Sequence, residues 1–237
     1  PYSLNEFVDV PQKIEQFKRA PFESDELRKI FNPDTYPNPK SRSNAARFWV
    51  PLIGLYQGCR LNEICQLDTA DIVVIKKIPC ISINDNGKDK SVKNKGSERI
   101  IPIHPQLIQL GFLHYVRYCQ QNHSHKLFSD KIKLMKSSYK RGVQAWFCRY
   151  IDGLGIDDPS KVFHSFRHTF ATKAIEKRIP TEYQNALGGW VDRGIGQRIY
   201  GHKRDIRVMY QELCKIKYPI NRELKELETE FKTGISL

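Results

Sequence analysis

The sequence has no run of about twenty apolar residues, the length that a membrane-spanning helix needs, so a membrane protein is not expected. None of its six cysteines forms a CxxC pair, which argues against a structural zinc site. It also has no carboxylate cluster with metal-ligand spacing, no internal repeat and no low-complexity tract. These absences leave an ordinary folded protein without an evident metal centre.

The chain also lacks an initiating Met and the basic-then-apolar pattern of a secretion signal. Several cysteines stand in apolar stretches, as buried reduced thiols do in a cytosol. We therefore expect a bacterial cytoplasmic protein, and the start of the chain is compatible with a fragment of a longer one.

Acidic residues are too few to balance the basic ones, and the net charge is +13 with a pI of about 9.5. Such a charge favours a polyanionic partner, and nucleic acid is the first candidate. An anionic membrane surface is a weaker interpretation. The remaining alternative is a basic surface that serves only solubility.

The 237 residues allow one sizeable domain or two small ones. Strand signals are few and short, at Ile72–Ile75, Cys80–Ile83 and Arg99–Ile103. Helical patterns cover most of the rest: a helix start near Ser24 as N-cap, then 44–57, 61–67, 105–121, 138–152, 164–178, 181–187, 205–216 and 221–231. We expect a mainly α fold with a small antiparallel β-sheet, whose long hairpin tip at 84–98 carries lysines.

Two segments combine arginine with a possible partner. Arg60 follows a glycine at a helix junction, and Glu63 lies three residues later, where it can share a helical face and orient the guanidinium. A structural ion pair is an equally good interpretation. In the second segment, His164 and His168 lie one helical turn apart with Arg167 between them. Arginine and histidine together suit an anion better than zinc.

Two further segments are weaker when taken alone. Gly189-Trp190 predicts a tight turn that presents an indole, and Tyr200 follows it next to a glycine. Lys93 lies at the predicted hairpin tip, where a lysine can reach a DNA phosphate or simply be solvated.

In their order and spacing, these segments resemble the tyrosine recombinase, or phage integrase, family. That family has an Arg-x-x-Glu box, a hairpin Lys before an Ile-Pro strand, a His-x-x-Arg-His box, a Gly-His or Gly-Trp pair, and a Tyr about nine residues later. The corresponding residues here are Arg60 with Glu63, Lys93, His164 with Arg167 and His168, Gly189-Trp190, and Tyr200. The resemblance spans roughly residues 21–216.

The sequence departs from the family pattern in two places. Trp190 stands where most members have His, and Tyr200 lies ten residues beyond it, one more than usual. Tyr210 is the next candidate nucleophile, and Lys95 is an alternative to Lys93 as the hairpin lysine.

The resemblance implies the integrase catalytic-domain fold, of the type found in DNA breaking-rejoining enzymes. It implies an N-terminal arm or linker at 1–20, a catalytic domain at 21–219 and a C-terminal helical tail at 220–237 that is exchanged between subunits or docks on its own domain. A separate core-binding domain would precede this chain in a complete integrase.

The implied chemistry is cleavage and rejoining of double-stranded DNA through a 3′-phosphotyrosyl bond to Tyr200, without cofactor or metal. Arg60 and Arg167 would clamp the phosphate, and Trp190 would donate its indole N–H to it or pack Tyr200. His164 would act as base and Lys93 as acid, with Glu63 and His168 in support. A homotetramer on DNA is expected, and the isolated domain can be monomeric.

Three alternatives remain at this stage. The first is a type IB topoisomerase-like enzyme, which shares this chemistry but relaxes DNA without exchanging strands. The second is a DNA-binding remnant that no longer cuts. The third and most distant is a zinc hydrolase built on His164 and His168.

Overall fold

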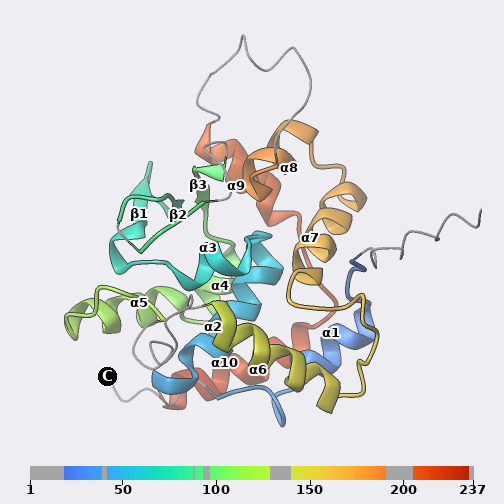
Figure 1. Ribbon diagram of the computed structural model, residues 1–237. Helices are drawn as coiled ribbons and strands as arrows, with labels where there is room; N and C mark the ends of the chain where they lie inside the picture. Colours follow the sequence, from blue (N-terminus) through green and yellow to red (C-terminus); the bar gives the residue numbers. More distant parts are fainter. Residues whose placement is uncertain are drawn as a thin grey trace, which may run out of the picture.

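The computed structural model describes residues 19–38, 42–87, 89–92, 97–128, 140–190 and 205–234. Within these ranges the chain is mainly helical, with one three-stranded antiparallel sheet at one side of the helices (Figure 1). The predicted fold class is therefore confirmed. The helices are α1 Ser24–Ile30, α2 Arg42–Gln57, α3 Leu61–Cys65, α4 Pro105–Gln109, α5 Phe112–Gln121, α6 Lys140–Gly153, α7 Ser165–Glu176, α8 Thr181–Gly188, α9 Ile206–Cys214 and α10 Asn221–Gly234.

Helix α2 lies at the centre of the packing. Its apolar residues point in all directions, and Phe48, Trp49 and Leu52 are completely buried. It contacts α3, α4, α6 and α7, so the segments that flank Arg60 and Arg167 are held by one common helix. A helix with apolar residues on most of its faces belongs in the core.

The sheet is a meander of β1 Ile72–Ile75, β2 Ile78–Ile83 and β3 Arg99–Pro102, in that order. Lys76 and Lys77 form the two-residue turn between β1 and β2, and both have positive φ angles, as tight hairpin turns require. Strand β2 begins two residues before the predicted position and β3 ends one residue before it. Strand β3 packs against α8 and α9, which places the sheet beside the C-terminal half of the chain.

Two local predictions were wrong. The pattern at 105–121 forms two helices rather than one, because Gly111 adopts a left-handed φ of 95° between α4 and α5. The N-cap of α1 is Glu23 rather than Ser24, and the backbone N–H of Glu23 donates to the Glu26 carboxylate at 2.7 Å.

The C-terminal helix packs on its own domain in this structure. Leu224 and Leu227 of α10 are buried in the common core, and Gln109 of α4 donates to Glu228 at 3.0 Å. The side chain of Phe231 and most of the predicted arm at 1–20 lie outside the described residues. Among the helices that are described, none has the length and apolar character to cross a membrane.

Candidate active site

Arg60 lies in the short connection between α2 and α3. The connection turns at Gly58, which has a φ of +61°, and a Cβ there would stand 2.6 Å from the ring of Phe170. The carbonyl of Gly58 accepts a hydrogen bond from Nη1 of Arg167 at 2.6 Å. A glycine is therefore needed at this turn, both for its backbone conformation and for the close approach of α7.

Glu63 is a buried carboxylate shared by two arginines. Arg60 Nη1 lies 2.6 Å from Glu63 Oε1, and Arg99 Nη2 lies 2.9 Å from Glu63 Oε2. The backbone N–H of Arg60 also donates to Glu63 at 2.9 Å. Burial alone would raise the pKa of Glu63, but Arg99 and then Arg60 hold it below its usual value. The carboxylate is therefore ionised and fixes the position of Arg60.

Arg167 projects from α7 into the interior, where it is 4% exposed. Its Nη1 donates to the carbonyls of Gly58 and Gly188, while its Nη2 is buried with no hydrogen-bond partner among the described residues. The guanidinium carbon lies 4.4 Å from the centre of the Trp190 ring, a cation–π distance. One side of Arg167 is thus held by backbone and indole, and one buried nitrogen has no acceptor among the described residues.

The end of α8 joins these arginines. Arg60 Nη2 donates to the carbonyl of Gly189 at 3.4 Å, next to the carbonyl of Gly188 that Arg167 binds. Gly189 has a φ of +63°, and a Cβ on it would stand 2.6 Å from Nη1 of Arg99. Arg60 and Arg167, 107 positions apart in the printed numbering, therefore meet at consecutive peptide units.

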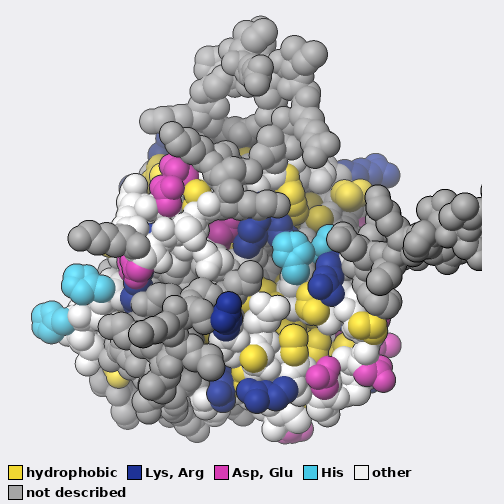
Figure 2. Space-filling view, in the orientation of Figure 1, with side chains coloured by type: hydrophobic (Ala, Val, Ile, Leu, Met, Phe, Trp, Pro, Cys, Tyr) yellow, Lys and Arg dark blue, Asp and Glu magenta, His cyan; other side chains and the backbone are white. Residues whose placement is uncertain are grey.

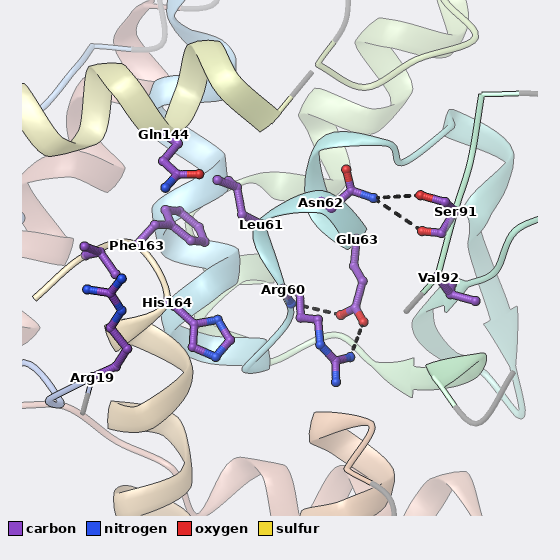
Figure 3. Close-up of a pocket in the computed structure, with 11 residues that line it drawn as sticks. Arg19, Arg60, Leu61, Asn62, Glu63, Ser91, Val92, Gln144, Phe163 and His164 are labelled. Carbon is purple, nitrogen blue, oxygen red and sulfur yellow. Dashed lines mark hydrogen bonds and ion pairs between the residues drawn. The ribbon is translucent and has the colours of Figure 1, made fainter. Parts of the chain in front are cut away.

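His164 is the N-cap residue of α7 and lines a hollow of about 580 Å³ together with Arg60 (Figure 3). The centres of the His164 and His168 rings are 5.2 Å apart. A zinc site on these two histidines would need further ligands, and the described part of the chain has no group of three or more His, Cys, Asp or Glu arranged to supply them.

The charges at this site do not cancel. Burial, followed by the charges of Arg60 and Arg99, lowers the pKa of Arg167 to about 9. Partial burial and then His168, Arg167 and Arg60 lower the pKa of His164 to about 4, so its ring is neutral at pH 7. Basic side chains and histidines lie together near the centre of the face in Figure 2. Such a surface can bind an anion, whose charge would offset the repulsion.

The described residues thus bring six of the predicted site residues into one region: Arg60, Glu63, His164, Arg167, His168 and Trp190. Lys93, its alternative Lys95 and Tyr200 lie outside the described residues. Tyr210 lies within the regular helix α9, where burial and then Cys214 raise the pKa of its hydroxyl.

Sequence reasoning missed two arginines at the site. Arg99 was assigned only to the start of a strand, although its position just before an Ile-Ile-Pro run at the site-side end of β3 is a usable signal. Arg19 was assigned to the linker, and its sequence neighbourhood offers no signal, because only the folded chain brings it to the hollow.

Comparison with known proteins identifies the family of this chain. The sequence profile of the Phage integrase family matches residues 22–207. A protein described as tyrosine recombinase XerC-like, from Caldanaerobacter subterraneus subsp. tengcongensis, is 25% identical over an alignment of 174 residues, and the match covers 64% of this chain and 44% of that protein. The chain therefore spans less than half the length of this relative.

Solved structures share the fold at low sequence identity. XerH site-specific recombinase is 21% identical with a TM-score of 0.51 over 87% of this chain and 56% of its own. XerA recombinase is 16% identical with a TM-score of 0.52 over 93% and 66%, and the Tn1549 transposon integrase is 14% identical with a TM-score of 0.53 over 85% and 66%. Because the family profile matches residues 22–207, well over half of the chain, the chain belongs to the phage integrase family of tyrosine recombinases.

Proposed function

We propose that this chain cuts and rejoins DNA by transesterification at the Arg60–Arg167 site, with Tyr200 as the nucleophile. The observation that carries the proposal is uncompensated positive charge. Among the described residues Glu63 pairs with Arg60 and Arg99, which leaves the charge of the neighbouring Arg167 unbalanced, and a buried nitrogen of Arg167 has no partner there. A phosphodiester supplies the missing charge and the missing acceptors.

Arg60 and Arg167 would bind the non-bridging oxygens of the attacked phosphate. Nη2 of Arg60 makes only a long hydrogen bond of 3.4 Å to the carbonyl of Gly189, and Nη2 of Arg167 makes none among the described residues. Both nitrogens could therefore donate hydrogen bonds to an anion. The negative charge on these oxygens grows in the transition state, where fixed donors bind it most strongly. Loss of one such donor typically lowers the rate by about 10²–10³.

His164 is suited to accept the proton of the attacking hydroxyl. A free tyrosine has a pKa of roughly 10, so attack near neutral pH needs a base. His164 is neutral at pH 7, so a ring nitrogen can accept a proton, and the charge of a bound phosphate would raise its pKa from about 4 and so strengthen it as a base. The tyrosine oxygen forms a bond to phosphorus, the bond to the 5′ oxygen breaks, and Lys93 would give a proton to that leaving oxygen. Rejoining is the reverse attack by the 5′ hydroxyl and needs no external energy source.

Tyr200 is preferred to Tyr210 for two reasons. It follows Trp190, which stacks on Arg167, by ten residues, and ten residues reach at most about 33–36 Å. A return to the phosphate site is therefore within reach of the chain. Tyr210 is fixed in α9 and its hydroxyl pKa is raised, which disfavours the phenolate.

The biological role would be site-specific recombination in the integration or excision of a prophage or other mobile element. Relatives of similar fold include an integrase from mycobacterium phage Brujita, and XerH bound to its difH substrate after cleavage. Double-stranded DNA is the proposed substrate, and a homotetramer on DNA is the proposed working form. The predicted domain limits, 21–219 for catalysis and 220–237 for an exchangeable tail, belong to the same proposal.

The test is covalent capture by the full-length protein on nicked suicide duplexes drawn from a random-sequence library. Tyr200→Phe should abolish the adduct while DNA binding survives, and Tyr210→Phe should leave capture largely unchanged. Mapping the modified residue in the wild-type protein gives an independent readout. An adduct on Tyr210, or capture that persists in Tyr200→Phe, would overturn the assignment.

A further inference from the structure

The hollow beside Arg60 extends well beyond a single phosphate. Its volume is about 580 Å³, in the range of about 300–1,000 Å³ that holds ligands of many atoms. Its described lining also includes polar and charged side chains away from Arg60, among them Arg19 and Gln144. The part of the hollow near Arg19 and Gln144 therefore has charged and polar groups of its own that could bind a ligand.

Arg19 supplies a second positive pole. Its Nη1 donates to the carbonyl of Pro159 at 3.0 Å, and the neighbouring N–H of Ala20 donates to Ser160 at 3.3 Å, so the residue is fastened to the loop before α7. In Figure 3, Arg19 and Arg60 lie on opposite sides of His164. Burial and Arg167 lower the pKa values of His164 and His168, and Arg19 makes a smaller contribution in the same direction. The charge of Arg19 therefore acts on both histidines.

An apolar stretch of the lining lies beside the two arginines. Leu61 and Phe163 line the hollow and are 6% and 3% exposed, and Val162 adjoins them. The view in Figure 3 has Leu61 and Phe163 between Gln144 and the His164–Arg60 side. Two cationic side chains beside an apolar stretch of the lining match a ligand with two anionic ends and a neutral middle.

A phosphate–deoxyribose–phosphate unit of DNA has this form. We propose that Arg19, assisted by Gln144, binds the phosphate adjacent to the one that is attacked, with the intervening sugar on Leu61 and Phe163. The inference rests on the proposed function, since it takes the Arg60–Arg167 site as the place of the first phosphate. Two consecutive phosphates held at fixed positions would set the register of the cleaved bond, because backbone contacts position a duplex.

The experiment compares small ligands and so needs no knowledge of the recombination site. Thymidine 3′,5′-bisphosphate carries two phosphates joined by one sugar, and thymidine 3′-monophosphate and 5′-monophosphate carry one each. Binding is measured by calorimetry or NMR at low salt and pH 7. The wild type should bind the bisphosphate about three- to tenfold more tightly than either monophosphate, as expected for an exposed charge-assisted contact.

Arg19→Ala should remove this preference and leave monophosphate binding unchanged, and Arg19→Lys should restore part of it. Arg117→Ala is the matched control, because Arg117 is an exposed arginine of α5 outside the described lining of the hollow and its loss changes the net charge equally. With duplex DNA, Arg19→Ala should lower the slope of log K against log [salt] by about 0.9.

The subsite and the proposed function fail in different ways. If Arg19→Ala keeps the bisphosphate preference, if the wild type has none, or if Arg117→Ala removes it equally, the subsite does not exist. Arg167→Lys tests the first phosphate separately and should weaken the monophosphates as well. If that variant is folded by circular dichroism and binds monophosphates as the wild type does, the main anion site is wrong, whatever Arg19 does.

Discussion

Arg99 Nη2 lies 2.9 Å from Glu63 Oε2, so an arginine 36 residues further along the chain holds the same carboxylate that orients Arg60. Arg99 is also bound on its other donors, by the carbonyls of Leu187 at 3.0 Å and Ser97 at 2.8 Å. With its donors occupied and its side chain only 7% exposed, Arg99 is a positioning residue rather than a phosphate ligand. It joins β3, the Arg60 turn and the end of α8.

The first prediction concerns the charge of Glu63. Glu63→Gln should lower the free energy of unfolding by about 3–5 kcal/mol, because it leaves buried guanidinium groups without their counter-charge. Urea unfolding at pH 7 measures the change. Glu226→Gln is the control: Glu226 pairs with Arg222 on the exposed face of α10, and its loss should cost less than about 1 kcal/mol. Equal effects in the two variants would contradict the assigned role of Glu63.

The second prediction separates two roles of Trp190. If the indole acts by stacking on Arg167, Trp190→Phe should keep most of the covalent capture of DNA, because phenylalanine retains an aromatic face. Trp190→Leu should then lower the capture rate by about tenfold, within the range of a partly buried cation–π contact. If the indole N–H instead donates to the phosphate, the Phe and Leu variants should be equally slow. Single-turnover capture rates decide between the two.

The sequence predicted the order of the helices and strands well, because long apolar patterns such as the one in α2 are local signals. The prediction failed where the backbone conformation of one residue determines where a helix ends. Gly111, for example, divides 105–121 into two helices. The prediction also could not find Arg19, because the bond to Pro159 joins residues 140 positions apart and leaves no local pattern.

The candidate site likewise has a part that the sequence predicts and a part that it does not. Arg60, His164 and Arg167 were found because each lies in a short motif with a recognisable spacing. The way they meet was not predictable from those motifs. It depends on the carbonyls of Gly188 and Gly189 and on Arg99, which connect segments far apart in the chain.

The third prediction concerns α10. Since Leu227 is fully buried in its own domain here, Leu227→Ala should lower the free energy of unfolding of the monomer by about 2–5 kcal/mol. Arg222→Ala, at an exposed position of the same helix, should leave the free energy of unfolding nearly unchanged. An unchanged stability in Leu227→Ala would mean that α10 is not docked in the free protein.

Exchange between subunits is tested separately. Deletion of 221–237 should abolish recombination by the full-length protein, and retained recombination would exclude the exchange.

The fourth prediction concerns acid stability through His104. Burial lowers the pKa of His104 to about 4; the ring Nδ1 accepts from the N–H of Gln106 at 3.0 Å and Nε2 lies 2.9 Å from the carbonyl of Ile216. Because the unfolded histidine titrates near about 6.5, the unfolded chain binds more protons between these two values. Stability should therefore fall by about 1.4 kcal/mol per pH unit from this residue as the pH drops from 6.5 towards 4. Urea unfolding at pH 7, 6 and 5 should show a smaller loss in His104→Gln, and an unchanged loss would contradict the assignment.

The fifth prediction links proton binding to anion binding at His164. In the free protein the pKa of His164 is lowered to about 4 by partial burial and by the surrounding positive charges. A phosphodiester in the Arg60–Arg167 site adds negative charge beside the ring, which favours the imidazolium and raises this pKa. Anion binding then takes up a proton, so by linkage the affinity should rise as the pH falls from the raised pKa of the complex towards about 4, by at most about tenfold per pH unit for one proton. The dinucleotide TpT is a suitable probe, because its phosphodiester keeps one charge throughout this range. His164→Asn should remove most of the pH dependence while His168→Asn retains it. A wild-type affinity that does not change between pH 7 and pH 4, or the opposite order of the two variants, would show that His164 does not face the bound phosphate.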